Sequence, residues 1–266
     1  MKIFLNEKPI EIDENTTAYE LRDEVDKDSD VVVLNGFPIK EESKLKEKDR
    51  ISLIQRGRVP KKEELEALLI ARHTPKVHEK LKKGKVAILG LGGLGSNIAV
   101  SLARVGVGEL TLVDYDVVEP SNLNRQQYFI ENIGMKKTEA LKSILERINP
   151  FTKVNTIDLY INKNNAEFLK ENSIIIEAFD DAKSKAMICN FALRNLKDNY
   201  LIASSGMAGY YDSNDIRTRK VRDKFYICGD FEHEAKPGDG LMAPRVSICA
   251  NHMANLAMQI LIDEID

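Results

Sequence analysis

The stretch Lys85-Val86-Ala87-Ile88-Leu89-Gly90-Leu91-Gly92-Gly93-Leu94-Gly95-Ser96 decides how this sequence is expected to fold. An apolar run stops at three glycines with the spacing G-x-G-x-x-G, which are Gly90, Gly92 and Gly95. A helical pattern follows at once, and the next apolar strand ends at Asp114. A strand, a glycine turn, a helix and a second strand that ends in an acid are typical of a nucleotide-binding crossover.

The residue types in this stretch suit a nucleotide chemically. Glycines let the backbone approach phosphates closely, and the first turn of the helix offers unpaired N–H groups to an anion. A carboxylate at the end of the next strand can accept hydrogen bonds from ribose hydroxyls. We therefore predict that the three glycines and Asp114 bind a nucleotide, with a purely structural turn as the alternative.

The composition narrows the class of protein. The chain has 266 residues, a formal net charge of -3 and a pI near 5.9, so nothing favours a nucleic-acid partner. It contains no apolar stretch long enough to span a membrane, and it starts with a strand-like segment that does not have the pattern of a signal peptide. Three widely separated cysteines predict neither disulfides nor a structural zinc site, and we expect a cytoplasmic protein.

Residues 1–58 have the pattern of a small separate unit. Alternating apolar residues predict two strands before residue 13, and Asn15 or Thr16 is the candidate cap of a short helix. Two more strands are predicted at Val31–Leu34 and Asp49–Gln55. Two strands, a helix and two further strands predict a β-grasp, the ubiquitin-like fold.

The rest of the chain alternates strands and helices. A charged helix in residues 59–82 is expected to link the first unit to the domain at residues 83–266. In that domain we expect strands at 85–89, 110–114, 154–159, 174–181 and 200–206, helices at 137–148 and 182–196, shorter antiparallel strands around 217–228, and a last helix from residue 244. Such alternation predicts an α/β domain with a mostly parallel sheet and helices on both faces.

A polar series after Asp114 indicates phosphate chemistry. Asn122, Arg125 and Lys137 supply an amide and two cations, which an enzyme that cleaves ATP at the α-phosphate needs and a dehydrogenase does not. Asp180 follows a buried strand and could hold Mg²⁺ against the phosphates. Two alternatives remain open at this point. Lys136 could take the place of Lys137 at the phosphates. Asp181 could take the place of Asp180 at the metal, and either acid could instead cap the next helix.

These motifs in this order resemble the ThiF/MoeB adenylyltransferases, which belong to the family of ubiquitin-like-protein activating enzymes. The resemblance covers residues 68–262 and rests on three segments: Gly90–Gly95, Thr111–Asp114 and Ser121–Gln126. It implies a Rossmann-like ATP-binding domain, with Asp114 on the ribose, Asn122, Arg125 and Lys137 on the phosphates, and Asp180 as the magnesium-linked acid. It also implies that Arg72 reaches the ATP of a second subunit in a homodimer, although a surface salt bridge is an equal alternative for this arginine.

The N-terminal unit resembles the ThiS-type sulfur carriers over most of residues 1–58. Such carriers react through a free C-terminal diglycine, whereas this chain continues through Gln55–Pro60 without one. We therefore interpret the unit as a scaffold or a mimic of the carrier.

Two features of the resembling family are missing from this chain. There are no C-x-x-C pairs, so we expect no zinc. The aligned position of the crossover-loop cysteine holds Lys236, and Cys228 is the nearest cysteine in sequence, with no evident base beside it. A step through a cysteine nucleophile is not expected.

The resemblance implies an ATP-dependent adenylyltransferase. Its substrate would be the C-terminal carboxylate of a separate sulfur-carrier protein ending in Gly-Gly, with release of pyrophosphate, in thiamin biosynthesis. Two alternatives stay open: a non-catalytic regulator in which residues 1–58 occupy the docking surface of the carrier, and an NAD-binding oxidoreductase.

Overall fold

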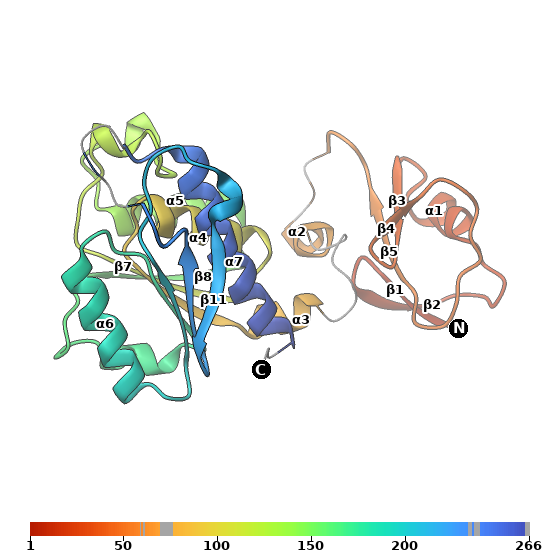
Figure 1. Ribbon diagram of the computed structural model, residues 1–266. Coiled ribbons are helices and arrows are strands. Elements are labelled where there is room, and N and C mark those ends of the chain that lie inside the picture. The colour runs from red at the N-terminus through yellow and green to blue at the C-terminus, as the bar shows by residue number, and fades with distance from the viewer. Residues whose placement is uncertain (59, 61, 70–76, 234–235, 237–239, 264–266) are drawn as a thin grey trace. The chain divides into compact units, whose positions relative to one another are not determined.

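The structure, a computed structural model drawn in Figure 1, describes residues 1–58, 60, 62–69, 77–233, 236 and 240–263. The chain divides into two compact units, Met1–Glu79 and Lys80–Asp266. Each unit has its own sheet and its own core. Within the described residues, no helix is both long enough and apolar enough to cross a membrane.

The first unit is a five-stranded sheet packed on one helix. Its strands lie in the order β2-β1-β5-β3-β4, and β1 pairs in parallel with β5 in the middle of the sheet. The elements are β1 (Lys2–Leu5), β2 (Lys8–Glu11), α1 (Ala18–Asp26), β3 (Val31–Leu34), β4 (Phe37–Ile39) and β5 (Arg50–Ile54). Buried apolar side chains of the helix and the sheet, among them Ile3, Leu21 and Ile51, form its core. This confirms the predicted β-grasp fold.

Two details of this unit differ from the sequence interpretation. The cap of α1 is Thr17, not Asn15 or Thr16, because Thr17 and Glu20 satisfy each other's backbone N–H groups in a capping box. The sequence interpretation also missed β4, a three-residue edge strand that contains Pro38. Proline is tolerated at a sheet edge, but it removes the strand signal from a short segment.

The second unit is built on a seven-stranded sheet. Its order is β11-β12-β10-β9-β6-β7-β8, and every neighbouring pair is parallel except β11 with β12. The strands are β6 (Lys85–Leu89), β7 (Glu109–Asp114), β8 (Lys153–Asp158), β9 (Ile174–Glu177), β10 (Tyr200–Ser204), β11 (Arg217–Arg222) and β12 (Phe225–Gly229). The predicted mostly parallel α/β sheet is confirmed.

Helices cover both faces of this sheet (Figure 1). The helices are α4 (Gly93–Arg104), α5 (Lys137–Ile148), α6 (Ala182–Asn195) and α7 (Ala243–Asp263). α7 packs along α4, and the inward side chains predicted for the last helix are all buried: Val246, Cys249, Met253, Leu256 and Ile260. α6 packs on the opposite face, where its Ile188 and Ala192 join the core of the sheet.

The strand order reverses beside β6, and this positions the site. The chain runs outward from β6 to β7 and β8, then returns to form β9 on the other side of β6. In open parallel sheets, ligands bind outside the carboxyl ends of the strands at such a switch point. The crevice is therefore expected beside the ends of β6, β7 and β9.

The segment between the two sheets holds α2 (Lys62–Leu69) and α3 (Val77–Lys83). The sequence interpretation extended the first of these helices to Arg72, which lies outside the described residues.

Candidate functional site

The glycine turn between β6 and α4 is fixed by close packing. Gly90 has φ +89°, and a Cβ on it would lie 2.9 Å from the carbonyl oxygen of Ala178. A Cβ on Gly95 would lie 1.8 Å from the carbonyl oxygen of Gly90, which no side chain permits. A Cβ on Gly92 would meet only the Gln126 side chain, at 3.8 Å. The packing of the turn therefore requires glycine at positions 90 and 95, whereas a Cβ on Gly92 would make only an ordinary contact.

Asp114 ends β7 and is tied to this turn. Its side chain is buried, one carboxylate oxygen accepts from the N–H of Leu91 at 2.7 Å, and the other accepts from the N–H of Asp116 at 2.9 Å. The hydroxyl of Tyr128 donates to the carbonyl oxygen of Leu91 at 2.8 Å, and burial raises the pKa of that phenol far above its usual range. The acid and the turn therefore form one rigid unit.

Arg125 lies over the start of α4. Its Cγ is 3.4 Å from the position that a Cβ on Gly93 would take, and its guanidinium donates to the carbonyl oxygen of Ser121 at 3.2 Å and to Oδ1 of Asn124 at 2.8 Å. Asn122 is buried in the same loop, where its Oδ1 caps the short turn by accepting from the N–H of Glu119. The loop therefore brings the half-exposed guanidinium of Arg125 to the glycine turn. The Asn122 carbonyl oxygen stabilises the loop, and its amide N–H groups remain for a ligand.

Gln126 is a residue that the sequence interpretation missed. Its side chain is buried beside Gly92, and its Oε1 has no hydrogen-bond partner among the described residues. An unpaired buried amide is costly unless a ligand or water completes it. The amide could not be singled out in sequence because nothing there showed that it would be buried against the turn.

Lys137 is buried at the first position of α5, and its ammonium lies 3.0 Å from a carboxylate oxygen of Asp116. This ion pair was not predicted. It neutralises the lysine at a helix start, where a cation is otherwise unfavourable. Lys136 has a different partner, with its ammonium 3.3 Å from Asp158. The Lys136 ammonium also donates to the carbonyl oxygen of Tyr115 at 3.1 Å, so both lysines lie at the carboxyl end of β7, and Lys137 is the buried one.

The two acids after β9 have different environments. Asp181 caps α6 by accepting from the N–H of Ser184 at 2.7 Å, and this bond lowers the pKa of its carboxyl. Asp180 is exposed, and its carboxylate has no hydrogen-bond or ion-pair partner in the described part of the chain. The pKa of Tyr115 is raised chiefly by Asp116, with Asp114 and Asp180 acting in the same direction.

We predict that these two acids differ in their effect on stability. Asp181→Ala removes a helix cap and is expected to lower the melting temperature by about 2–4 °C. Asp180→Ala breaks no described contact and is expected to leave it unchanged. Thermal unfolding of both variants measures this, and an equal loss in the two would contradict the assignment of the cap.

A buried ion pair supports the turn that carries Asp180. Glu177 is 0 % exposed at the end of β9, and its carboxylate accepts from the N–H of Phe179 at 2.7 Å and from the Lys185 ammonium at 3.0 Å. Lys185, on α6, also donates to the hydroxyl of Ser204. Burial raises the pKa of the Glu177 carboxyl, against the opposing effect of Lys185. The sequence interpretation did not find this pair, whose members stand on different elements.

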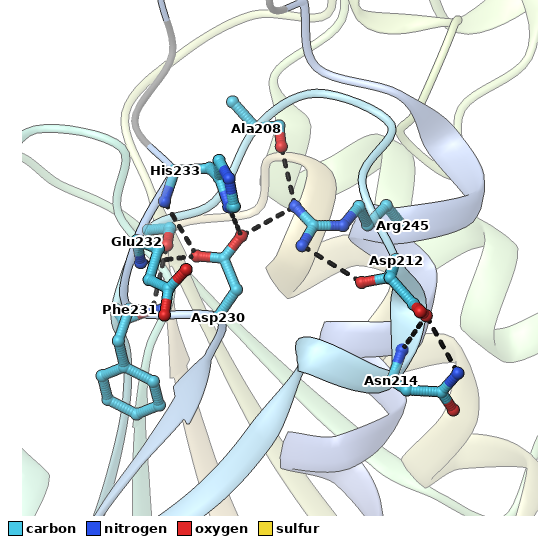
Figure 2. Close-up of polar contacts among 10 residues, drawn as sticks. Ala208, Asp212, Asn214, Asp230, Phe231, Glu232, His233 and Arg245 are labelled. Atoms are coloured by element: carbon cyan, nitrogen blue, oxygen red, sulfur yellow. Dashed lines mark hydrogen bonds and ion pairs between the residues drawn. The ribbon is translucent and has the colours of Figure 1, made fainter.

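A second polar cluster joins the ends of the segment between β12 and α7 (Figure 2). The Asp230 carboxylate accepts from the Arg245 guanidinium at 2.7 Å and from Nδ1 of His233 at 3.1 Å. Arg245 also donates to the carbonyl oxygen of Ala208 at 2.8 Å. Nearby, Asn124 donates through Nδ2 to the carbonyl oxygen of Leu241 at 3.3 Å. The segment after β12 is therefore anchored at both ends and touches the loop that carries Arg125.

The cysteines are poor nucleophile candidates. Burial raises the pKa of Cys228 to about 11 and that of Cys189 and Cys249 to about 12. Cys228 is 0 % exposed and contacts the hydroxyl of Thr218 at 3.4 Å.

The model of the ThiF family matches residues 66–265, which include every element of the site described above. This chain belongs to the ThiF family. The model described as ThiS-like ubiquitin matches residues 1–57. These two matches confirm both resemblances that the motifs indicated.

Individual relatives match this chain over shorter stretches than the family model does. The tRNA threonylcarbamoyladenosine dehydratase of Haemophilus influenzae is 36% identical over 148 residues, which is 54% of this chain and 56% of that protein. The molybdopterin-synthase adenylyltransferase of the same organism is 38% identical over 117 residues, which is 42% of this chain and 48% of that protein. The matches thus span about half the length of these relatives.

Among solved structures, the E. coli tRNA N6-threonylcarbamoyladenosine dehydratase TcdA, in complex with ATP, is similar in fold. The TM-score is 0.67 with 23% sequence identity, over 74% of this chain and 93% of that chain.

Proposed function

We propose that the protein is an ATP-dependent adenylyltransferase. The observation that carries the proposal is the combination of Arg125 over the start of α4 with Asp114 tied to the glycine turn. This combination suits a nucleotide whose ribose lies near β7 and whose phosphates lie at the helix. The similarity to an adenylyltransferase and to a structure that contains ATP supports the same function.

The substrate that we propose is the C-terminal carboxylate of a separate ThiS-like sulfur carrier. A carboxylate oxygen attacks the α-phosphorus of ATP, a new O–P bond forms, and the bond to the β-phosphate oxygen breaks to release pyrophosphate. The attacking group is already anionic at neutral pH, so the reaction needs no side-chain nucleophile or general base. Catalysis then rests on positioning and on neutralising the charge of the phosphates.

Each side chain has a role in this proposal. Arg125 and Lys137 neutralise the phosphates, and Lys137 shares its charge between Asp116 and the ligand. Asn122, through its remaining amide N–H groups, adds a phosphate contact, and the unpaired Oε1 of Gln126 accepts from a donor of the nucleotide such as a ribose hydroxyl. Asp114 accepts from the ribose. In a homodimer, Arg72 from a second copy of the chain would add a further cation.

Asp180 fits a magnesium ion, because its exposed carboxylate is free at the end of β9 and oxygen ligands suit this cation. No three His, Cys, Asp or Glu side chains gather into a metal site in the described ranges, so the phosphates would complete the coordination. When bound, the ion supplies positive charge against the phosphate oxygens. Thiamin biosynthesis is the pathway that we propose, supported by the ThiS-like unit.

Exchange of labelled pyrophosphate into ATP tests the proposal. We expect exchange by the full-length protein only when a carrier with a free Gly-Gly terminus is added, since the carboxylate is the attacking group. A carrier amidated at that terminus is the matched control and should give none. Absence of exchange with every diglycine-ended carrier would contradict the enzyme and favour a binding role.

A further inference from the structure

The strand β11 is an exposed row of cations. It has the sequence Arg217-Thr218-Arg219-Lys220-Val221-Arg222, and all six residues are exposed. Among the strands that the structure describes, it forms one edge of the seven-stranded sheet and pairs with β12 alone. A strand at this position presents backbone N–H and C=O groups to solvent in addition to its side chains.

The four cations of β11 form no ion pair within the part of the chain that the structure describes, although Asp215 and Asp223 stand just outside the strand. Arg219 only stacks on the ring of Phe231, at 3.9 Å. Acidic residues outnumber basic ones in the chain, 42 to 39, so this local positive charge is not a property of the whole surface.

The strand starts beside the second polar cluster, at the carboxyl end of the sheet. Arg217 pairs with Gly229 at the carboxyl end of β12, and the next residue, Asp230, holds Arg245 in the cluster of Figure 2. Phe231, which Arg219 covers, belongs to the same cluster. From the carboxyl end of the sheet, the row of cations thus runs outward along its edge to Arg222.

We propose that β11 is the docking strand for the carrier protein, and that it pairs with an acidic edge of the carrier sheet. This docking role rests on the proposed function. The guanidinium groups of three arginines bind carboxylates in two-point contacts, and the free strand edge can extend the sheet of a partner. The carrier tail would then reach the nucleotide past the anchored segment after β12.

Two other roles for β11 are protection of the sheet edge and binding of a nucleic acid. Each would use only some of its cations and free backbone groups. Charges on an edge strand prevent unwanted pairing between sheets, a role for which lysine is the usual cation, whereas three of the four cations of β11 are arginines. A nucleic acid would also attract cations and can accept from backbone N–H groups, yet it does not extend a sheet, and the net charge of -3 opposes it. An acidic protein edge uses both the charges and the backbone.

The test compares two charge-reversal variants of the full-length protein. Arg219→Glu/Arg222→Glu is expected to weaken binding of a ThiS-type carrier by about tenfold or more, because steering and contact are both lost. Lys163→Glu/Lys170→Glu makes the same change in net charge at exposed positions away from β11 and should bind normally. Binding is measured by calorimetry at low and high salt, and the salt dependence should shrink only in the β11 variant.

Binding is measured with a carrier that lacks its terminal Gly-Gly, so docking is tested apart from the chemistry. Wild-type binding that the β11 variant loses supports the docking strand even if pyrophosphate exchange fails. Equal binding by both variants, or no binding by the wild type, would overturn it. Loss of RNA binding in the β11 variant with unchanged carrier binding would overturn it in favour of a nucleic-acid surface. Equal melting temperatures exclude unfolding as the cause.

Discussion

Carrier-dependent pyrophosphate exchange is expected to fall by about 100- to 1,000-fold when Arg125 is replaced by alanine. In the proposed reaction the guanidinium neutralises charge on the phosphates as the bond to pyrophosphate breaks. Its side-chain bonds in the free protein are made at the surface to Ser121 and Asn124, so their loss should not disturb the fold. The rate should fall while the melting temperature stays unchanged.

Arg104 provides the matched control for this experiment. It is an exposed arginine in the last turn of α4, at the opposite end of the helix from Arg125. Arg104→Ala should keep full exchange. Full activity in the Arg125→Ala variant would show that the site assignment is wrong, whereas equal losses in both variants would point to a general effect on stability.

The second large effect is expected in stability. Lys185→Met leaves the Glu177 carboxylate buried without its cation and is expected to lower the free energy of unfolding by about 3–5 kcal/mol at pH 8. The double variant Glu177→Leu/Lys185→Met removes the unpaired charge as well and should recover most of the loss. Urea denaturation of the two variants and the wild type measures both values.

This loss should depend on pH in a defined direction. Burial already raises the pKa of Glu177 in the folded state, and removing Lys185 removes the main opposing effect. Below the pKa of the unfolded chain, the carboxyl is neutral in both states and carries no charge penalty. The penalty grows as the pH rises from the unfolded pKa to the raised folded pKa and is complete above it. The deficit of Lys185→Met should therefore be small near pH 4 and full at pH 8, and a constant deficit would contradict this origin.

Periodic patterns in the sequence predicted most of the fold. Helix α5 was predicted at Lys137–Ile148, the range that it has in the structure, because its apolar stripe and the Asn149-Pro150 stop are both local signals. The buried face of α7 was predicted for the same reason. The cap at Thr17 was missed because Asn15 and Thr16 beside it are equally good capping residues. The strand β4 was missed because Pro38 is unfavourable in a strand.

The site was less predictable than the fold. The glycines and the loop with Arg125 belong to a compact motif, so their positions followed from the sequence. The partners of the charged groups did not, because Asp116 meets Lys137 and Glu177 meets Lys185 only after separate elements pack. The resemblance favoured Asp180 over Asp181 for the metal, but only the structure shows that Asp181 caps α6.

Asn124 couples two regions of the surface. Its Oδ1 accepts from Arg125, and its Nδ2 donates to the carbonyl oxygen of Leu241 in the segment that leads into α7. A phosphate that binds Arg125 would break its hydrogen bond to Asn124. A polypeptide that moves Leu241 would break the other hydrogen bond of Asn124. Thermodynamic reciprocity then applies: whatever factor the nucleotide contributes to the affinity for the second ligand, that ligand contributes equally to the affinity for the nucleotide. The mutual effect of the two substrates on each other's affinity is thus expected to depend on this asparagine side chain.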